Sequence, residues 1–225
     1  MNLKTRKIAI DGPAGAGKSS IAKETAKKLG FVYVDTGAMY RTVGLNVLNA
    51  GKNPKIKEDV LSVLDDVNID IKYFDGVQNI FLNGENVSEL IRTPEVSVAA
   101  SDVAVIGEVR VKLVELQRSL AERTDVIMDG RDIGTRVLPD ADVKIFLTAS
   151  AEERATRRLK ELEEKGISCS YEDVLSDIKY RDKNDSEREI DPLRPTDESV
   201  IFDTTGLTLN ESVERMLKLL KEKLI

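Results

Sequence analysis

Eight residues near the start of the chain have the clearest chemical meaning. They read Gly12-Pro13-Ala14-Gly15-Ala16-Gly17-Lys18-Ser19 and match the pattern G-x-x-x-x-G-K-[ST]. A predicted strand, Lys7–Asp11, precedes them and a predicted helix, Lys18–Leu29, follows. Glycines let backbone N–H groups surround an oxyanion, and the helix N-terminus adds about half a positive charge there. We therefore expect this loop to bind the phosphates of a nucleoside triphosphate, although a glycine-rich turn that binds nothing is the alternative.

Side chains at the end of this loop and after a later strand are candidates for a metal site. Lys18 is expected to reach the terminal phosphates, the Ser19 hydroxyl to ligate Mg²⁺, and Ser20 to extend the start of the helix. Asp129 ends the apolar run that begins at Val126, which is the usual place for an aspartate that holds Mg²⁺ directly or through water. An ordinary turn before the next glycine is the alternative for Asp129.

Two arginines follow predicted strands directly and suggest a second phosphate site. Arg41 lies in the first turn of the helix after the strand Phe31–Asp35, and Arg131 comes directly after Asp129. Open α/β sheets bind ligands at the carboxyl ends of their strands, where the triphosphate loop also lies. The planar guanidinium fits phosphate oxygens well. We expect Arg41 and Arg131 to bind a phosphate that faces the triphosphate, and simple surface solvation is the alternative.

Further arginines recur at helical spacing later in the chain. Arg154, Arg157 and Arg158 form one cluster, and Arg181, Asp185 and Arg188 are spaced to share a face of another predicted helix. Gly166 to Ser170 separate the two helices. The pattern favours a helical lid over about residues 150–190 that brings arginines onto the transferred phosphoryl group and excludes water. A solvated, charged helical hairpin is the alternative.

The composition excludes several other kinds of chemistry and partner. The chain has 225 residues and no histidine, which removes serine–histidine and cysteine–histidine nucleophiles and histidine-based zinc sites. A net charge of −6, no tryptophan and 4% aromatic residues argue against a nucleic-acid polymer as partner. Cys169 is the only cysteine, so no internal disulfide forms. No signal peptide or membrane span is expected, and the sequence favours a cytoplasmic monomer whose partners are small molecules.

Apolar runs that alternate with amphipathic helices predict an α/β fold. Five strands form a parallel sheet flanked by helices, because each pair of strands is joined by a helical crossover. The remaining helices are expected over Ala38–Ala50, from Ser150 to Gly166, from Thr208 to the C-terminus, and over Glu95–Glu122 with a break near Gly107. The expected strands are Lys7–Asp11, Phe31–Asp35, Val126–Asp129, Val143–Leu147 and Val200–Asp203.

One region interrupts this order. Asn68–Phe74 and Val77–Leu82 alternate apolar and polar residues around Asp75-Gly76, which predicts a two-residue hairpin, and Asn83-Gly84 predicts a second turn. We expect a small antiparallel β insert over residues 60–95 within a single domain, 1–225. The pattern alone does not distinguish a decoration from a clamp over a ligand.

Six segments resemble those of bacterial-type cytidylate kinases, members of the nucleoside monophosphate kinase group with a P-loop NTPase-type sheet. The segments are Ile10–Ser19, Asp35–Arg41, Ile91–Val96, Asp129–Thr135, Pro139–Leu147 and Arg181–Asp185, and they fall in family order. The resemblance implies transfer of the γ-phosphoryl group of ATP to CMP or dCMP with Mg²⁺, giving ADP and CDP or dCDP, in pyrimidine nucleotide metabolism.

The same resemblance implies a role for individual residues. Thr36, Arg41 and Arg131 would hold the acceptor phosphate, and Ser101, Arg110 and Asp132 would read the cytosine edge. Arg181 and Asp185 would meet the sugar, and Arg188 would lie near the phosphates. Arg154, Arg157 and Arg158 would belong to a lid over ATP. Lys18, Arg131, Arg158 and Arg188 are accordingly the expected catalytic residues, and Arg157 is expected to help bind ATP.

Two other functions are consistent with the triphosphate loop alone. One is a different small-molecule kinase that acts on UMP, AMP or a non-nucleotide acid. The other is a nucleotide-dependent switch, but the N-K-x-D pattern for guanine is absent, and Asp203–Gly206 is the only D-x-x-G, with a single helix after it. The sequence therefore favours the kinase.

Overall fold

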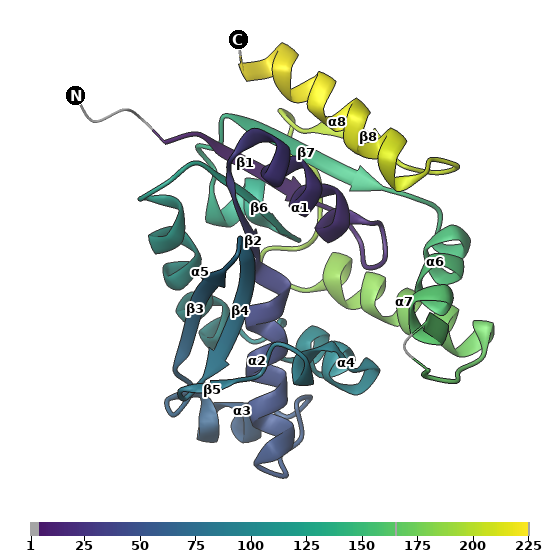
Figure 1. Cartoon of the computed structure of the whole chain (residues 1–225). Helices are drawn as coiled ribbons and strands as arrows, with labels where there is room; N and C mark the ends of the chain where they lie inside the picture. The colour runs from purple at the N-terminus through teal and green to yellow at the C-terminus, as the bar shows by residue number, and fades with distance from the viewer. Residues whose placement is uncertain (1–4, 165, 225) are drawn as a thin grey trace.

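The computed structural model describes residues 5–164 and 166–224 and has two sheets. The larger sheet has five parallel strands in the order β2-β6-β1-β7-β8, which confirms the predicted parallel sheet (Figure 1). The central strands are short apolar runs, because both faces of the sheet are covered there. The strands are β1 (Lys7–Asp11), β2 (Val32–Asp35), β6 (Val126–Gly130), β7 (Val143–Thr148) and β8 (Val200–Asp203).

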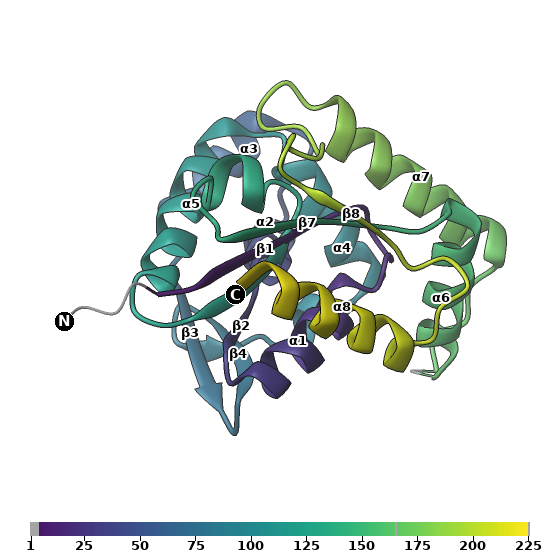
Figure 2. The same cartoon turned by 90° about the horizontal axis from the view of Figure 1, so that it is seen from above.

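Helices cover both faces of this sheet (Figure 2). α1 (Lys18–Leu29) and α8 (Leu209–Leu224) pack on the face that carries Ile8 and Ile10 of β1. α2 (Thr36–Asn49) and α5 (Gly107–Ala121) pack on the opposite face, toward which Ala9 points. Because strand side chains alternate between faces, Asp11 also points to the second face.

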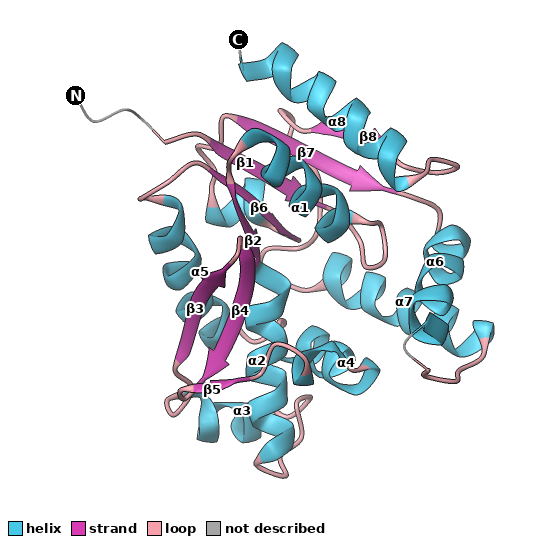
Figure 3. Ribbon diagram, in the orientation of Figure 1, coloured by secondary structure: helices cyan, strands magenta, loops and turns pink. Residues whose placement is uncertain are grey.

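The small sheet is antiparallel and lies beside α2 (Figure 3). Its strands are β3 (Ile69–Phe74), β4 (Val77–Leu82) and β5 (Glu85–Asn86). Asp75 and Gly76 both have positive φ, as the two-residue turn requires, so the hairpin prediction is confirmed. α3 (Lys57–Leu64) was not predicted; it precedes the hairpin and overlaps the region assigned to the β insert. This eight-residue helix buries only Val60 and Leu64, too few apolar positions for a clear helical period.

A chain of short elements connects the small sheet to the end of the main one. η1 (Leu90–Arg92) and α4 (Pro94–Val103) precede α5, which confirms the expected break near Gly107. A π-helical turn, η2 (Ile133–Val137), follows β6. α6 (Ala151–Glu164) and α7 (Tyr171–Glu187) form a helical hairpin beyond β7. In the described part of the chain, no helix is long and apolar enough to span a membrane.

Three boundary or burial predictions were wrong. α2 begins at Thr36 rather than Ala38, because the Asp35 carboxylate caps it by accepting from the Ala38 N–H at 2.9 Å. Arg188 lies beyond the end of α7 with extended backbone, so it does not share a helical face with Arg181 and Asp185. The spacing of Leu209, Val213, Leu217, Leu220 and Leu224 predicts one apolar face of the C-terminal helix, but Leu209 is 46% exposed at the first position of α8.

Candidate active site

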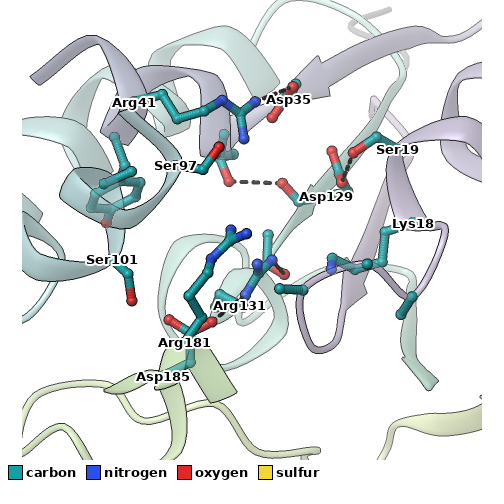
Figure 4. Close-up of a pocket in the computed structure, with 18 of the residues that line it drawn as sticks. Lys18, Ser19, Asp35, Arg41, Ser97, Ser101, Asp129, Arg131, Arg181 and Asp185 are labelled. Carbon is teal, nitrogen blue, oxygen red and sulfur yellow. Dashed lines mark hydrogen bonds and ion pairs between the residues drawn. The ribbon is translucent and has the colours of Figure 1, made fainter. Parts of the chain in front are cut away.

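A cavity of about 670 Å³ opens at the carboxyl ends of β2 and β6, between the Gly12–Ser19 loop, α4 and the α6–α7 hairpin. This volume is typical of a small-molecule site. Side chains from α1, α2, α7 and the end of β6 project into it (Figure 4). Four residues expected at the site do not line it: Gly12, Pro13, Arg110 and Arg157. Those that do are Ala14, Gly15, Ala16, Gly17, Lys18, Ser19, Ser20, Thr36, Arg41, Ser101, Asp129, Arg131, Asp132, Arg158, Arg181, Asp185 and Arg188.

The Gly12–Ser19 loop is shaped by its glycines. A Cβ atom on Gly12 would lie 1.9 Å from the Leu147 carbonyl oxygen, and φ of +150° there excludes other residues as well. Gly17, with φ of +87°, is the N-cap of α1 and offers no side-chain cap. The first N–H groups of α1 are therefore left for another partner, which is the arrangement that binds an anion at a helix start.

Lys18 lies at the floor of the loop. Its side chain is buried, and its Nζ donates to the Pro13 carbonyl at 2.7 Å. Burial and the nearby Arg131 guanidinium hold the pKa of Lys18 well below its usual range. An anion between Lys18 and Arg131 would offset both effects and favour the charged amine.

Ser19 and Asp129 meet beside the loop, as the metal-site prediction requires. Asp129 Oδ2 accepts from Ser19 Oγ at 2.9 Å, and Oδ1 accepts from the Tyr33 hydroxyl at 3.0 Å. Burial, and then the Asp35 carboxylate, raise the pKa of Asp129 to about 6. Adjacent hydroxyl and carboxylate oxygens suit a hard cation, and Mg²⁺ needs only one or two protein oxygens when phosphates supply others. The donor set at this position fits the ion.

Asp35, at the start of α2, pairs with two arginines, one from α2 and one from η1. Its Oδ2 lies 2.8 Å from Arg41 and 3.1 Å from Arg92, and these two cations overcome the effect of burial to keep the pKa of Asp35 below its usual value. The buried Arg41 Nε has no partner among the described residues. Thr36 Oγ1 donates to the Asp129 carbonyl at 2.7 Å, so its proton points away from the cavity. No role was predicted for Arg92, because only the fold brings η1 to Asp35.

Arg131 and Arg181 add more positive charge to the same space. Arg131 Nε lies 2.7 Å from Asp185 Oδ2, and this partner outweighs burial and raises the pKa of Arg131. Burial and the Arg131 charge lower the pKa of Arg181 to about 10, and the Arg181 Nε has no partner among the described residues. These desolvated cations with free N–H donors make the cavity a site for polyanions.

A separate ion-pair cluster lies behind the cavity wall. Arg110 is almost fully buried and donates to Asp132, while Arg188 approaches the other oxygen of Asp132 at 3.4 Å. Asp191, which the sequence analysis did not identify, binds Arg110 as well, at 3.1 and 3.2 Å. Ser101 lies nearby and accepts from Asn184 at 3.4 Å. Asp132 and Ser101 face the cavity, so a ligand there meets a carboxylate and a hydroxyl.

The arginines of α6 have three different environments. Arg154 is buried and ties the hairpin together: it donates to the Ala14 carbonyl at 2.8 Å and to both oxygens of Asp182. Arg157 donates to the Thr204 carbonyl at 2.8 Å, in the loop between β8 and α8. Arg158 lines the cavity and pairs with Glu161 at 3.1 Å.

Side chains of β4 and β3 hydrogen-bond the small sheet to the edge of the site. Gln78 of β4 accepts from the Asp35 backbone N–H at 2.8 Å and donates to the Asp35 carbonyl at 3.3 Å. Tyr73 donates to the Tyr33 carbonyl at 3.1 Å. The hairpin thus contacts Asp35, the residue that orients Arg41 and Arg92. The one sign of this contact in the sequence is a polar residue in an alternating strand.

Comparisons with known proteins are consistent with this geometry. Residues 8–222 match the family model described as cytidylate kinase. A cytidylate kinase of Caldicellulosiruptor saccharolyticus is 55% identical over 96% of each chain, and one of Bacillus cereus is 49% identical over 94% of each. Two solved structures share the fold at low identity. An uncharacterized protein of Eubacterium ventriosum has a TM-score of 0.55 at 14% identity, and the match covers 97% of this chain and 99% of that protein. A Thermus thermophilus protein has a TM-score of 0.50 at 17% identity, and the match covers 99% of this chain and 100% of that protein.

Proposed function

This chain belongs to the cytidylate kinase family and phosphorylates CMP and dCMP, and from that premise we propose how its residues divide the work. ATP is the phosphoryl donor and binds through its phosphates to the Gly12–Ser19 loop and the uncapped start of α1. CMP or dCMP binds on the opposite side of the cavity with its phosphate toward the loop. The cluster of desolvated cations at the centre of the cavity carries this proposal, since two facing phosphate chains need neutralising charge between them.

The acceptor phosphate is assigned to Arg41 and Arg131. Arg41 lies in α2, which follows β2, and Arg131 directly follows the neighbouring strand β6. Arg41 pairs with Asp35 and Arg131 with Asp185, and each arginine can turn N–H donors from its carboxylate to a phosphate. The free Nε of Arg41 points to the same use. Arg158 of α6 and Arg188 beyond the end of α7 are placed to approach the transferred phosphoryl group. Thr36 contributes by holding the Asp129 carbonyl.

The base and sugar are assigned to the wall formed by α4, η2 and α7. Cytosine presents an amino donor and two acceptors. The Asp132 carboxylate can accept from the amino group and the Ser101 hydroxyl can donate to an acceptor, while Arg110, which does not line the cavity, binds Asp132 from behind. Arg181 and Asp185 of α7 lie between this wall and Arg131, where the sugar of a bound nucleotide would lie. A base with a different edge would leave these buried groups unpaired, at a cost of several kcal/mol.

Ser19 and Asp129 would hold Mg²⁺ at the triphosphate, and the ion would neutralise charge on the transferred phosphoryl group. The protein needs no strong base, because phosphoryl transfer through a loose transition state depends on alignment and charge. Holding two phosphates in line can supply on the order of 7–11 kcal/mol of the barrier. The α6–α7 hairpin acts as a lid over ATP, with Arg154 joining Ala14 of the loop to Asp182 of α7.

A coupled assay of ADP formation tests the proposal. ATP and MgCl₂ are supplied with CMP, dCMP, UMP, AMP or GMP in turn, and turnover is expected with CMP and dCMP and to depend on Mg²⁺. Adenylate turnover above cytidylate turnover, or full activity in excess EDTA, would contradict the assignment.

A further inference from the structure

The chain turns back on itself immediately after α7. Residues 188–193, which we call the return segment, leave the helix and lie against its last turn, where the Leu193 N–H donates to the Asp185 carbonyl at 2.7 Å. Ile190 packs against the start of α5: a Cβ on Gly107 would be 2.9 Å from the Ile190 Cδ1 atom. The return segment therefore links α7 to the helix that carries Arg110.

Asp191 has the most contacts in this segment. Its Oδ2 accepts from Arg110 Nε at 3.2 Å and from an Arg110 terminal nitrogen at 3.1 Å. Its carbonyl accepts from Arg188 Nε at 2.7 Å. Asp191 thus binds both guanidinium groups that flank Asp132. Its φ is +48°, a left-handed conformation that Asp and Asn adopt more readily than other residues with a side chain.

Asp191 adds a second carboxylate beside the two guanidinium groups that flank Asp132. Two buried guanidinium groups, Arg110 and Arg188, share the single buried carboxylate of Asp132. The Asp191 side chain is 24% exposed and supplies the second negative charge, with Arg136 at its outer side at 3.7 Å. Without the Asp191 side chain, Asp132 would be the one carboxylate still paired with Arg110 among the described residues, and the orientation of the Asp132 carboxylate would change.

We propose that Asp191 is a positioning residue for base recognition, which fixes Arg110 against Asp132 so that the Asp132 carboxylate is held ready for the amino group of cytosine. The inference rests on the proposed function of Asp132. Asp191 does not line the cavity and touches no nucleotide itself. Its effect is on selectivity among acceptor bases, whereas the triphosphate loop lies elsewhere and is unaffected.

The test compares Asp191→Asn and Asp191→Gly with the wild type. Both replacements tolerate positive φ, and the first removes only the charge while the second removes the side chain. The matched control is Asp75→Asn, since Asp75 is an exposed hairpin residue with a similar φ of +52°. KM and kcat are measured for CMP, UMP and ATP, and the melting temperature is recorded for each variant.

We expect Asp191→Asn to raise KM for CMP about tenfold, which is 1.4 kcal/mol, and Asp191→Gly to raise it further. KM for ATP should stay within about twofold, and the preference for CMP over UMP should fall. If KM for CMP rises less than about fivefold in both variants, or if KM rises equally for CMP and ATP, the role of Asp191 is overturned. With a wild type that phosphorylates CMP normally, such a result leaves the proposed function intact. Failure of the wild type to phosphorylate CMP overturns the proposed function as well.

Discussion

Replacing Asp129 with asparagine should raise the free energy of unfolding and, at the same pH, remove most of the kinase activity. The Asp129 carboxylate is fully buried at the end of β6, and its pKa is raised from 3.8 to about 6. Because the folded-state pKa is the higher one, the ionised carboxylate destabilises the fold once the pH rises above 3.8, and the full cost is present above pH 6. The difference of about 2 pKa units corresponds to about 3 kcal/mol at pH 7.5 and to about 1 kcal/mol at pH 4.5.

Asparagine keeps the shape of the side chain and can still bond to Ser19 and Tyr33. Urea unfolding in EDTA should therefore show a free energy of unfolding that is higher by up to about 3 kcal/mol at pH 7.5, a gain that shrinks at pH 4.5. Kinase activity with Mg²⁺ should fall by about 10² or more, because the proposed metal ligand is lost.

Asp125→Asn is the control, since Asp125 precedes the same strand at the opposite end and accepts from the Arg6 N–H. It should change neither activity nor the pH dependence of stability. Destabilisation of Asp129→Asn at pH 7.5, or a gain that does not depend on pH, would refute the reasoning about the buried charge.

Three further substitutions test the acceptor side. Arg131→Ala should lower kcat/KM for CMP by about 10²–10³, while ATP affinity measured by titration changes little; unchanged turnover would remove the phosphate-clamp role. Asp132→Ala should reduce the preference for CMP over UMP by about tenfold or more in competition assays, and a loss confined to ATP binding would contradict base recognition. Gln78→Ala removes two hydrogen bonds to the Asp35 backbone and should raise KM for CMP by about fivefold, with KM for ATP constant; equal rises for both substrates would show a general loss of structure instead.

The local patterns in the sequence were sufficient for the main sheet and the triphosphate loop. The central strands are short apolar runs because they are buried on both faces, and the glycines at 12 and 17 adopt backbone angles that the loop requires. The two-residue turn at Asp75-Gly76 was likewise visible, since its residue types match its positive φ values. These features depend on residues close together in the chain.

The contacts that orient the site depend on distant residues and could not be read from local patterns. Gln78 meets Asp35 across 43 positions, and Asp191 meets Arg110 across 81. The end of α7 carries no glycine stop signal, so Arg188 was assigned to a helical face it does not share. The lid role of the α6–α7 hairpin and the roles of individual arginines remain predictions, because they concern a nucleotide-bound state.

The most direct test of two phosphate chains meeting over one cationic cavity uses a single molecule that carries both nucleotides. In this molecule cytidine and adenosine are joined 5′ to 5′ through five phosphates. One molecule should bind per protein chain, and it should compete with both ATP and CMP. It should bind at least about tenfold more tightly than CMP, because one binding event then uses both halves of the cavity. Competition with only one of the two nucleotides, or binding of two molecules per chain, would contradict the account.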